Sequence, residues 1–336
     1  MSESSEIIRI AAKGDGVTAD GRHVAGGVPG DRVRADGLLD HGPHHVHPPC
    51  AHFGRCGGCQ LQHADEDALR GFVTDRVVNA AAGQGVQIGD LLPTHLSPPR
   101  SRRRATLHAQ KTACGAVLGF REAGSHRIVN LADCHVLAPE LAAVLPALRA
   151  FAARHGGRNA VDIELTLADQ GVDCGLRNIA LEGLAATEAA LELAQASQLA
   201  RLTLDQGYGA EAVWEPEPAT ITLSGRPVGL PPGSFLQATR DGEQRLVEDV
   251  QAWIGDAASI ADLFAGLGTF AFALAGPAKV LAAEAARDAH LACKAAAGRA
   301  GLPIAAMHRD LFRNPLQPAE VDRFEAVVID PPRAGA

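Results

Sequence analysis

From about residue 233 onward, the chain alternates short apolar segments with helix-forming segments. A helix is expected over roughly 286–299. Strands that alternate with helices form a parallel, doubly wound sheet whose ligands lie at the carboxyl ends of its strands. This part of the chain is therefore predicted to be a Rossmann-like α/β domain. Its four expected strands are 259–264, 279–284, 303–307 and 324–330.

The turn after the first expected strand carries two glycines, Gly266 and Gly268, followed by Thr269. A Gly-x-Gly turn between a strand and a helix lets the backbone approach a ligand closely. Glu284 ends the second strand, where an acid accepts hydrogen bonds from ribose hydroxyls. A dinucleotide site would have a third glycine where this chain has Phe270-Ala271. The pattern therefore favours adenosyl-methionine over NAD, although both ligands present a ribose to this acid.

Three cysteines, Cys50, Cys56 and Cys59, lie in one glycine-rich stretch of ten residues. Soft thiolate ligands on such a loop are typical of zinc and of iron–sulfur clusters, because glycines let the backbone fold around the metal. Both centres normally need a fourth ligand, and Cys134 is a candidate. A redox pair and a chance grouping are the remaining explanations. A thiol–disulfide oxidoreductase would need Cys56-Gly-Gly-Cys59 at the start of a helix that follows a strand.

Composition sets the cellular context. With 336 residues the chain is long enough for two or three domains, and it has no apolar run that could span a bilayer. The first six residues lack the features of a signal peptide. Seven cysteines, unevenly clustered, suit a reducing cytoplasm better than a disulfide framework. We therefore expect a cytoplasmic protein without a membrane partner, and no protein partner is inferred.

The net charge of −8 is unevenly distributed. Between Arg100 and Arg127 there are seven basic residues and one acid. Such a stretch could bind phosphate groups, since the local field matters more than the total charge, but a solvated arginine-rich strand explains it equally well. The candidate nucleic-acid contacts are Arg100, Arg102, Arg103 and Arg104.

The remaining segments suggest two further domains. Residues 6–36 have short strands and closely spaced turns, which suit a small barrel. Residues 37–49 form a Pro/His-rich linker, whose four histidines we interpret as solvated. A helix is expected to begin at Asp65-Glu-Asp67, and another helical stretch lies near 138–153. The apolar face of the first helix would consist of Leu69, Phe72, Val73 and Val77.

Several of these motifs occur in an order that resembles one known family. Cys50-x5-Cys56-x2-Cys59 precedes Phe235-Leu-Gln237, the Asp262–Gly268 segment and Asp330-Pro-Pro-Arg333. With these motifs the chain looks like the iron–sulfur-containing RNA uracil-5-methyltransferases, whose best-known members act on large-subunit ribosomal RNA. The resemblance covers essentially the whole chain.

The resemblance implies an architecture of three domains. Residues 1–45 would be a TRAM domain, an OB-type barrel that binds RNA. Residues 46–232 would be a mixed α+β central domain carrying the cluster loop. Residues 233–336 would be a Rossmann-like methyltransferase domain that is incomplete here.

The resemblance also implies the ligands of the sites. Cys50, Cys56, Cys59 and Cys134 match the ligands of a 4Fe–4S cluster, with zinc as the minor alternative. S-adenosyl-L-methionine would be the methyl donor and RNA the partner. Thr239 departs from the family pattern, which usually has Asn there. The positions matching those that line the donor pocket are Gln237, Phe264, Glu284, Asp310 and Asp330, beside the turn residues Gly266, Gly268 and Thr269.

In such enzymes a cysteine thiolate adds to C6 of uracil, so that C5 becomes nucleophilic enough to take the methyl group. A general base then removes the C5 proton, so that the bond between the cysteine and C6 breaks and the cysteine leaves. The family has this cysteine in a Ser-Cys-Asn-Pro segment that this sequence lacks up to Ala336. We therefore expect a fragment whose nucleophile lies beyond Ala336, and a chain that does not methylate RNA as it stands.

Two alternatives to a ribosomal RNA enzyme are kept. The first is a transfer-RNA uracil-5-methyltransferase, although such enzymes commonly lack the TRAM-like region and the cysteines. The second is a non-catalytic RNA-binding or assembly protein with a vestigial cofactor fold.

Overall fold

In the computed structural model, which describes residues 5–332, the chain forms two compact units. The first unit runs to Pro99 and resumes over Gly119–His135. The second comprises Arg100–Leu118 and the chain from Val136 onward. The chain therefore enters the second unit, returns to the first and then enters the second again. Among the described residues, no helix is both long enough and apolar enough to cross a membrane.

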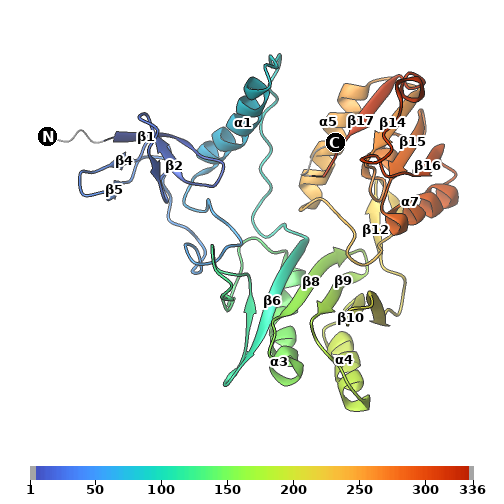
Figure 1. Ribbon diagram of the computed structural model, residues 1–336, viewed down its shortest axis with the longest axis horizontal. Coiled ribbons are helices and arrows are strands. Elements are labelled where there is room, and N and C mark those ends of the chain that lie inside the picture. The colour runs from blue at the N-terminus through green and yellow to red at the C-terminus, as the bar shows by residue number, and fades with distance from the viewer. Residues whose placement is uncertain (1–4, 333–336) are drawn as a thin grey trace. The chain divides into compact units, whose positions relative to one another are not determined.

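The first unit begins with a five-stranded antiparallel sheet in the order β3-β2-β1-β4-β5 (Figure 1). Closely spaced turns separate its short strands, as the sequence predicts. Ile7, Ile10, Val17 and Val33 are its buried apolar side chains. Its strands are β1 Ser5–Ile10, β2 Gly16–Thr18, β3 His23–Val24, β4 Arg32–Val33 and β5 Leu39–Asp40.

The histidine-rich segment 37–49 is more ordered than a solvated linker. Part of it forms β5, and the Nδ1 atom of His45 lies 2.8 Å from the fully buried carboxylate of Asp31. His41 stacks on His45 with ring centroids 3.5 Å apart, and His44 lies 2.9 Å from Asp65. The interpretation of solvated histidines is therefore wrong for His45, because a buried carboxylate needs hydrogen-bond partners and this segment supplies two, His45 and the Gly42 amide. His41 and His47 are exposed, as the interpretation expects.

Helix α1, Glu66–Gly83, begins where its acidic first turn predicts, with Asp65 as the N-cap that accepts a hydrogen bond from the Ala68 amide. Leu69 and Phe72 pack against the sheet residues. The predicted apolar face is wrong farther along, since Val73 and Val77 are 38% and 56% exposed. The helix residues in this apolar cluster are Ala68, Leu69 and Phe72, all from its first half.

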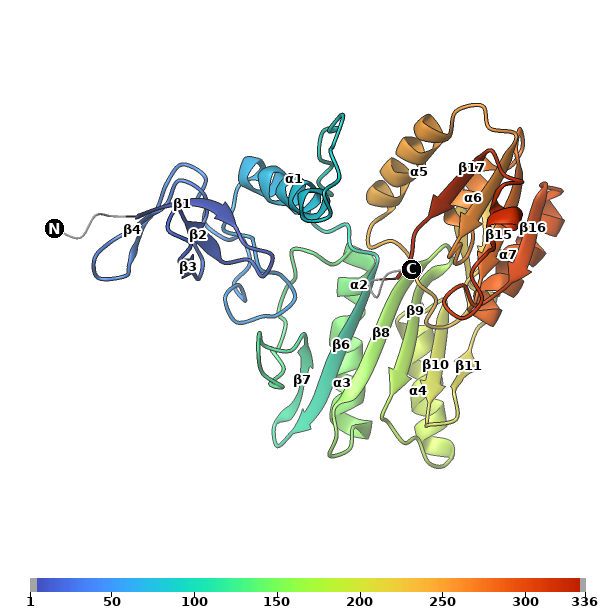
Figure 2. The ribbon, with the colours of Figure 1, turned by 45° about the horizontal axis from the view of Figure 1, so that its top comes forward.

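The second unit contains a six-stranded mixed sheet in the order β11-β10-β9-β8-β6-β7 (Figure 2). Helices α2, α3 and α4 lie against one of its faces. On β8, Ile163 and Leu165 are buried against that face, whereas Glu164 and Thr166 are partly exposed on the other. The strands are β6 Arg104–Thr112, β7 Gly115–Gly119, β8 Val161–Ala168, β9 Gly171–Arg177, β10 Arg201–Asp205 and β11 Ala210–Trp214.

The expected helical stretch near 138–153 consists of two helices, α2 Pro139–Ala143 and α3 Leu145–His155. Pro146 stands in the first turn of α3, where its missing amide leaves no hydrogen bond unmade. The same proline cannot continue α2, so the stretch divides at Val144. Helix α4, Leu184–Ala196, follows β9.

The C-terminal part contains a parallel sheet in the order β16-β15-β14-β17, as predicted from the alternating pattern (Figure 1). Its strands are β14 Ser259–Leu263, β15 Lys279–Glu284, β16 Ile304–His308 and β17 Ala326–Ile329. Its helices are α5 Arg240–Ile254, α6 Thr269–Leu274, α7 Arg287–Ala300 and α8 Pro318–Val321.

A hairpin, β12 Thr220–Leu223 and β13 Arg226–Gly229, packs against α6 and α7. Ile221 and Val228 of this hairpin belong to the same buried core as Phe270 and Phe272. The hairpin thus shares the core of the parallel sheet, although the predicted boundary at 232 places it in the central domain. The division into three domains remains a prediction.

Candidate functional site

All four strands of the parallel sheet end at one edge, and polar residues follow them there. Glu284 is the last residue of β15, and Phe264 and Asp330 directly follow β14 and β17. Asp310 lies two residues beyond β16. The fold therefore gathers four of the predicted site residues at the edge where open α/β sheets bind their ligands.

The glycine turn adopts conformations that other residues rarely take. Gly266 and Gly268 have φ of 57° and 97°, and Gly268 is the N-cap of α6. A Cβ at Gly268 would lie 2.9 Å from the Sγ of Cys293 and 2.9 Å from the ring of Phe272. Nothing lies within 4 Å of a Cβ at Gly266. The second glycine is thus required by packing as well as by φ.

The carboxylate of Glu284 holds this turn. Its Oε2 accepts a hydrogen bond from the Gly266 amide at 2.8 Å, and its Oε1 accepts one from the Ala286 amide at 2.6 Å. Each oxygen has a second lone pair. Glu284 can therefore fix the turn and still accept a hydrogen bond from a ligand hydroxyl.

Asp262 was not among the predicted site residues, yet it is fully buried beneath the turn. Its Oδ2 accepts a hydrogen bond from the Ala271 amide at 2.9 Å, and its Oδ1 has no hydrogen-bond partner within the described part of the chain. Burial raises the pKa of Asp262 to about 7, and the nearby acids Asp330 and Glu284 add to this shift. Its position near the end of a buried strand, just before the glycine turn, could have marked Asp262 as a site residue in the sequence.

A cavity of about 290 Å³ lies beside the glycine turn and is of the size of small-ligand sites. Gly266 and Glu284 line it, whereas the other predicted pocket residues do not. Most of the residues that line this cavity were not predicted, although the run Pro231-Pro232-Gly233 before Phe235 is a turn signal. The lining residues are Pro231, Pro232, Gly233, Ser234, Phe235, Gly266, Leu267, Glu284, Ala286, Arg287, Asp288 and Ala289.

Phe264 is a bulky residue held at φ 64°, a conformation that costs of order 1–3 kcal/mol and concentrates at functional sites. The ring of Phe312 lies 5.3 Å from the ring of Phe264 at an interplanar angle of 54°. Phe312 is 53% exposed. The pair forms an aromatic surface at the same edge of the sheet, and Phe312 was not predicted.

The arginine cluster divides into inward and outward members. Arg103 is 1% exposed and its Nη2 lies 2.5 Å from Glu243. The prediction that Arg103 contacts RNA is therefore wrong, because strand alternation turns its side chain into the core. Arg102 and Arg104 are partly exposed. Arg100, four residues before the start of β6, has a φ of 58°.

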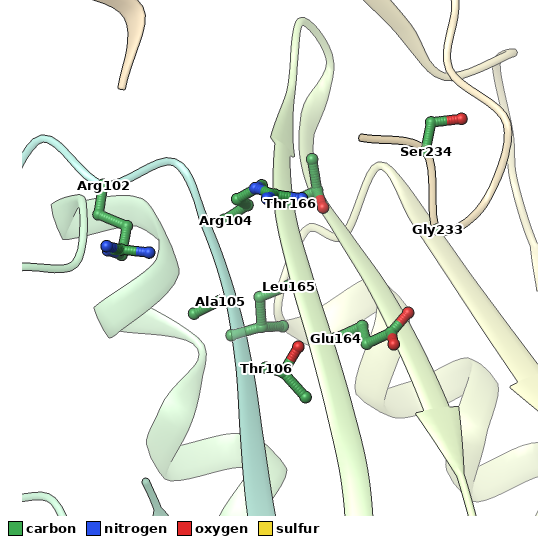
Figure 3. Close-up of a pocket in the computed structure, with 9 residues that line it drawn as sticks. All are labelled: Arg102, Arg104, Ala105, Thr106, Glu164, Leu165, Thr166, Gly233 and Ser234. Atoms are coloured by element: carbon green, nitrogen blue, oxygen red, sulfur yellow. The ribbon is translucent and has the colours of Figure 1, made fainter. Parts of the chain in front are cut away.

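Arg102 and Arg104 line a second cavity, of about 240 Å³, shown in Figure 3. Thr166 and Glu164 of β8 form its floor, and the Gly233–Ser234 loop lies on its other side. The guanidinium of Arg104 lies 4.4 Å from the centre of the Phe235 ring, within cation–π distance. Burial lowers the pKa of Arg104, and the positive charges of Arg102 and Arg103 lower it further.

The four predicted metal ligands all belong to the first unit. Segment 120–134 is hydrogen-bonded to the cysteine loop, with the Gly57 amide donating to the Arg121 carbonyl and the Ala132 amide to His52 Nε2. The Cys59 thiol experiences the electrostatic influence of Cys56, Cys134 and Cys50, so the four sulfurs share one locality.

This locality has the chemistry of a metal site, because its four side chains are soft sulfur donors. Burial raises the pKa of Cys59 to about 11 and also raises the pKa of Cys56. A bound metal cation would lower both pKa values, because it stabilises the thiolate form. Four thiols in one locality offer the ligands that zinc and iron–sulfur clusters take.

With this geometry established, curated relatives define the class of protein. The chain is 49% identical over 332 residues to an uncharacterised RNA methyltransferase of Zymomonas mobilis, covering 98% of this chain and 84% of that protein. A Caulobacter vibrioides protein described in the same words is 40% identical, with 98% and 84% covered. The chain belongs to this family of RNA methyltransferases. No protein-family model matches it.

A further relative is named for its substrate. The 23S rRNA (uracil(1939)-C(5))-methyltransferase RlmD of Erwinia tasmaniensis is 30% identical over 344 residues, covering 95% of this chain and 74% of that protein. Among solved structures, the Pyrococcus abyssi tRNA (uracil-54, C5)-methyltransferase in complex with S-adenosyl-L-homocysteine matches with a TM-score of 0.73. That match is 20% identical and covers 99% of this chain and 84% of the other, so it shows the fold.

Proposed function

We propose that this chain belongs to an enzyme that transfers a methyl group from S-adenosyl-L-methionine to C5 of a uridine in RNA, with 23S rRNA as the preferred substrate. The observation that carries the proposal is the glycine turn held by Glu284 at the carboxyl edge of the parallel sheet, beside a cavity of about 290 Å³. The relationship to RlmD at 30% identity supports uridine C5 as the target.

In this proposal the bound donor supplies an activated methyl group, and the chain positions it. Glu284 accepts hydrogen bonds from ribose hydroxyls, while Gly266 and Gly268 keep the backbone close enough to contact the ligand. The roles of Gln237, Phe264, Thr269, Asp310 and Asp330 as pocket residues remain predictions. The expectation that the nucleophilic cysteine lies beyond Ala336 also remains a prediction, and Arg333–Ala336 lie outside the described residues.

For the RNA, we propose the cavity of Figure 3 as one contact. Arg102 and Arg104 offer positive charge there, and Phe235 offers a ring on which a base can stack. Phosphate contacts of this kind hold a nucleic acid without reading its sequence. The β1–β5 sheet is proposed as the TRAM-like RNA-binding module, and the cytoplasmic location is part of the proposal on the strength of cysteine usage.

We propose further that Cys50, Cys56, Cys59 and Cys134 hold a 4Fe–4S cluster. A methyl transfer moves no electrons, so the cluster would be structural and would fix the loop in place. Protein prepared without oxygen should be brown and absorb near 400 nm, as expected for charge transfer from thiolate to iron. A colourless protein containing zinc would overturn this assignment.

The donor site is tested by titrating the protein with S-adenosyl-L-homocysteine in a calorimeter. Wild-type protein should bind, and Glu284→Ala should bind about tenfold or more weakly, because the ribose contact and the support of Gly266 are both lost. Glu325→Ala is the matched control. The carboxylate of Glu325 also accepts a hydrogen bond from a backbone amide, that of Ala258, but at the start of β14 and not at its carboxyl end. Equal losses in both variants would exclude this pocket as the donor site.

The RNA target is tested in cells. Nucleoside analysis of RNA from a strain that lacks the gene should show the loss of 5-methyluridine from 23S rRNA. Loss from transfer RNA instead would favour the alternative substrate, and unchanged methylation in both would favour a non-catalytic RNA-binding protein.

A further inference from the structure

The stretch from Pro231 to Thr239 forms a wall shared by two cavities, and we call it the crossing segment. Gly233 and Ser234 line the cavity beside the glycine turn and also the cavity of Figure 3. Phe235 contributes to the first cavity and contacts Arg104 of the second. The position of this segment therefore sets the shape of both.

The crossing segment has no regular secondary structure, so specific contacts must hold it in place. Leu236 is buried, and Thr239 caps α5 by accepting a hydrogen bond from the Gly242 amide. Between these two residues the backbone carbonyls of Gln237 and Ala238 are available to the rest of the protein.

Arg103 binds both of these carbonyls. Its backbone amide donates to the Ala238 carbonyl at 2.9 Å, and its Nε donates to the Gln237 carbonyl at 3.0 Å. Its backbone carbonyl accepts a hydrogen bond from the Leu167 amide of β8 at 2.7 Å. A single residue thus fastens the crossing segment to the sheet that carries the second cavity.

Glu243 completes the arrangement from the first turn of α5. Its carboxylate lies 2.5 Å from Nη2 of Arg103, and both side chains are nearly excluded from solvent. A guanidinium directs its donors in a fixed planar fork, so the pair with Glu243 orients Nε toward Gln237. A lysine could keep the ion pair but could not bind both partners in this geometry.

We propose that Arg103, oriented by Glu243, is a positioning residue that sets the crossing segment for donor binding. The inference rests on the proposed function, because it takes the cavity beside the glycine turn as the donor pocket. Arg103 acts through the backbone of Gln237 and Ala238 and does not contact a ligand.

A second buried ion pair provides the matched control. Arg201 donates to Asp173 from Nε and Nη2 at 2.9 and 2.7 Å, with side chains 4% and 9% exposed. This pair joins β10 to β9, and within the described part of the chain its side-chain hydrogen bonds link it to Glu215 and not to the crossing segment. Asp173 lines a small cavity together with Pro232 and Gly233 but is not bonded to either of them. A purely structural role of Arg103 would give the same results as substitution of this control pair.

The experiment compares Arg103→Lys and Glu243→Gln with Arg201→Lys and Asp173→Asn in the full chain. Calorimetric titration with S-adenosyl-L-homocysteine should show affinity about tenfold weaker in the first two variants, the scale seen when supporting partners of a binding site are removed. The control variants should lower the midpoint of thermal unfolding to a similar extent and bind like wild type. Unchanged affinity in the first two variants, or an equal loss in all four, would overturn the proposal.

Hydrogen exchange separates this inference from the proposed function. The amides of residues 233–239 should exchange faster in Arg103→Lys and Glu243→Gln than in the controls, whether or not the ligand binds. Wild-type protein that does not bind the ligand would refute the proposed function alone. Unchanged exchange in residues 233–239 would refute the positioning role alone. If Arg103→Lys fails to fold, Glu243→Gln, which keeps a hydrogen-bond acceptor, decides the outcome.

Discussion

The cysteine loop and the sheet edge are two ways of building a site. Around Cys56 and Cys59 the chain has isolated bridges and turns, and burial opposes ionisation of the thiols that would bind a metal. At the sheet edge, four hydrogen-bonded strands position the glycine turn, and the half-buried carboxylate of Glu284 accepts a hydrogen bond from it. From this difference we predict that the first site needs a bound metal to be stable, whereas the second is largely formed without a ligand.

The largest expected effect tests whether the loop depends on its ligand. Cys134→Ser should remove most bound iron, from about four atoms per chain for an intact cluster, and expose residues 50–63 and 120–134 to proteolysis. Metal analysis and limited trypsin digestion measure this. Cys114→Ser, which alters an exposed cysteine, is the control and should behave like wild type. Full iron content in Cys134→Ser would exclude Cys134 as a ligand and with it the dependence of the loop on a bound metal.

The next prediction concerns the buried ion pair between Arg201 and Asp173 in the six-stranded sheet. Arg201→Met should lower the free energy of unfolding by about 3–5 kcal/mol, because Asp173 would remain buried without its partner. Urea unfolding followed by circular dichroism measures the change. Arg177→Met removes an exposed pair with Glu164 and should change the same quantity by about 1 kcal/mol or less. Equal effects of the two substitutions would contradict the role assigned to burial.

A smaller effect tests whether the sheet edge is formed before its ligand binds. Gly268→Ala should destabilise the protein by about 2–4 kcal/mol, because the methyl group meets Cys293 and Phe272 at a positive φ. Gly266→Ala meets no atom and should cost about 1–2 kcal/mol through φ alone. Thermal unfolding of both variants gives the comparison. A turn that tolerated both substitutions equally would be flexible rather than preformed.

The smallest effect depends on pH. Because the folded pKa of Asp262 is about 7 and the ordinary value is 3.8, the folded state holds this proton more tightly than the unfolded chain does. Stability relative to Asp262→Asn should therefore fall as pH rises through this window, by about 2–3 kcal/mol between pH 5 and 7, and then remain constant. Urea unfolding of both proteins between pH 5 and 8 measures the difference. A difference independent of pH would show that Asp262 titrates normally.

Local sequence patterns predicted those features of the candidate site that depend on neighbouring residues. The strand ending at Glu284 and the glycines after β14 follow from periodicity and turn chemistry, and the sheet order brings them together. The inward position of Arg103 was missed, since three consecutive arginines look alike until β6 is paired with β8. Phe312 and Ser234 were missed because loops bring them to the edge.

Residue type and short-range spacing were enough to predict the parallel sheet and its glycine turn, and they marked three neighbouring thiols as candidate metal ligands. Only the tertiary structure decided that Arg103 supports Gln237 and Ala238 and that Asp262 lies buried with a raised pKa. Burial and long-range hydrogen bonding arise when distant segments pack, and the energy of an ionic group depends on that packing rather than on its neighbours in the chain.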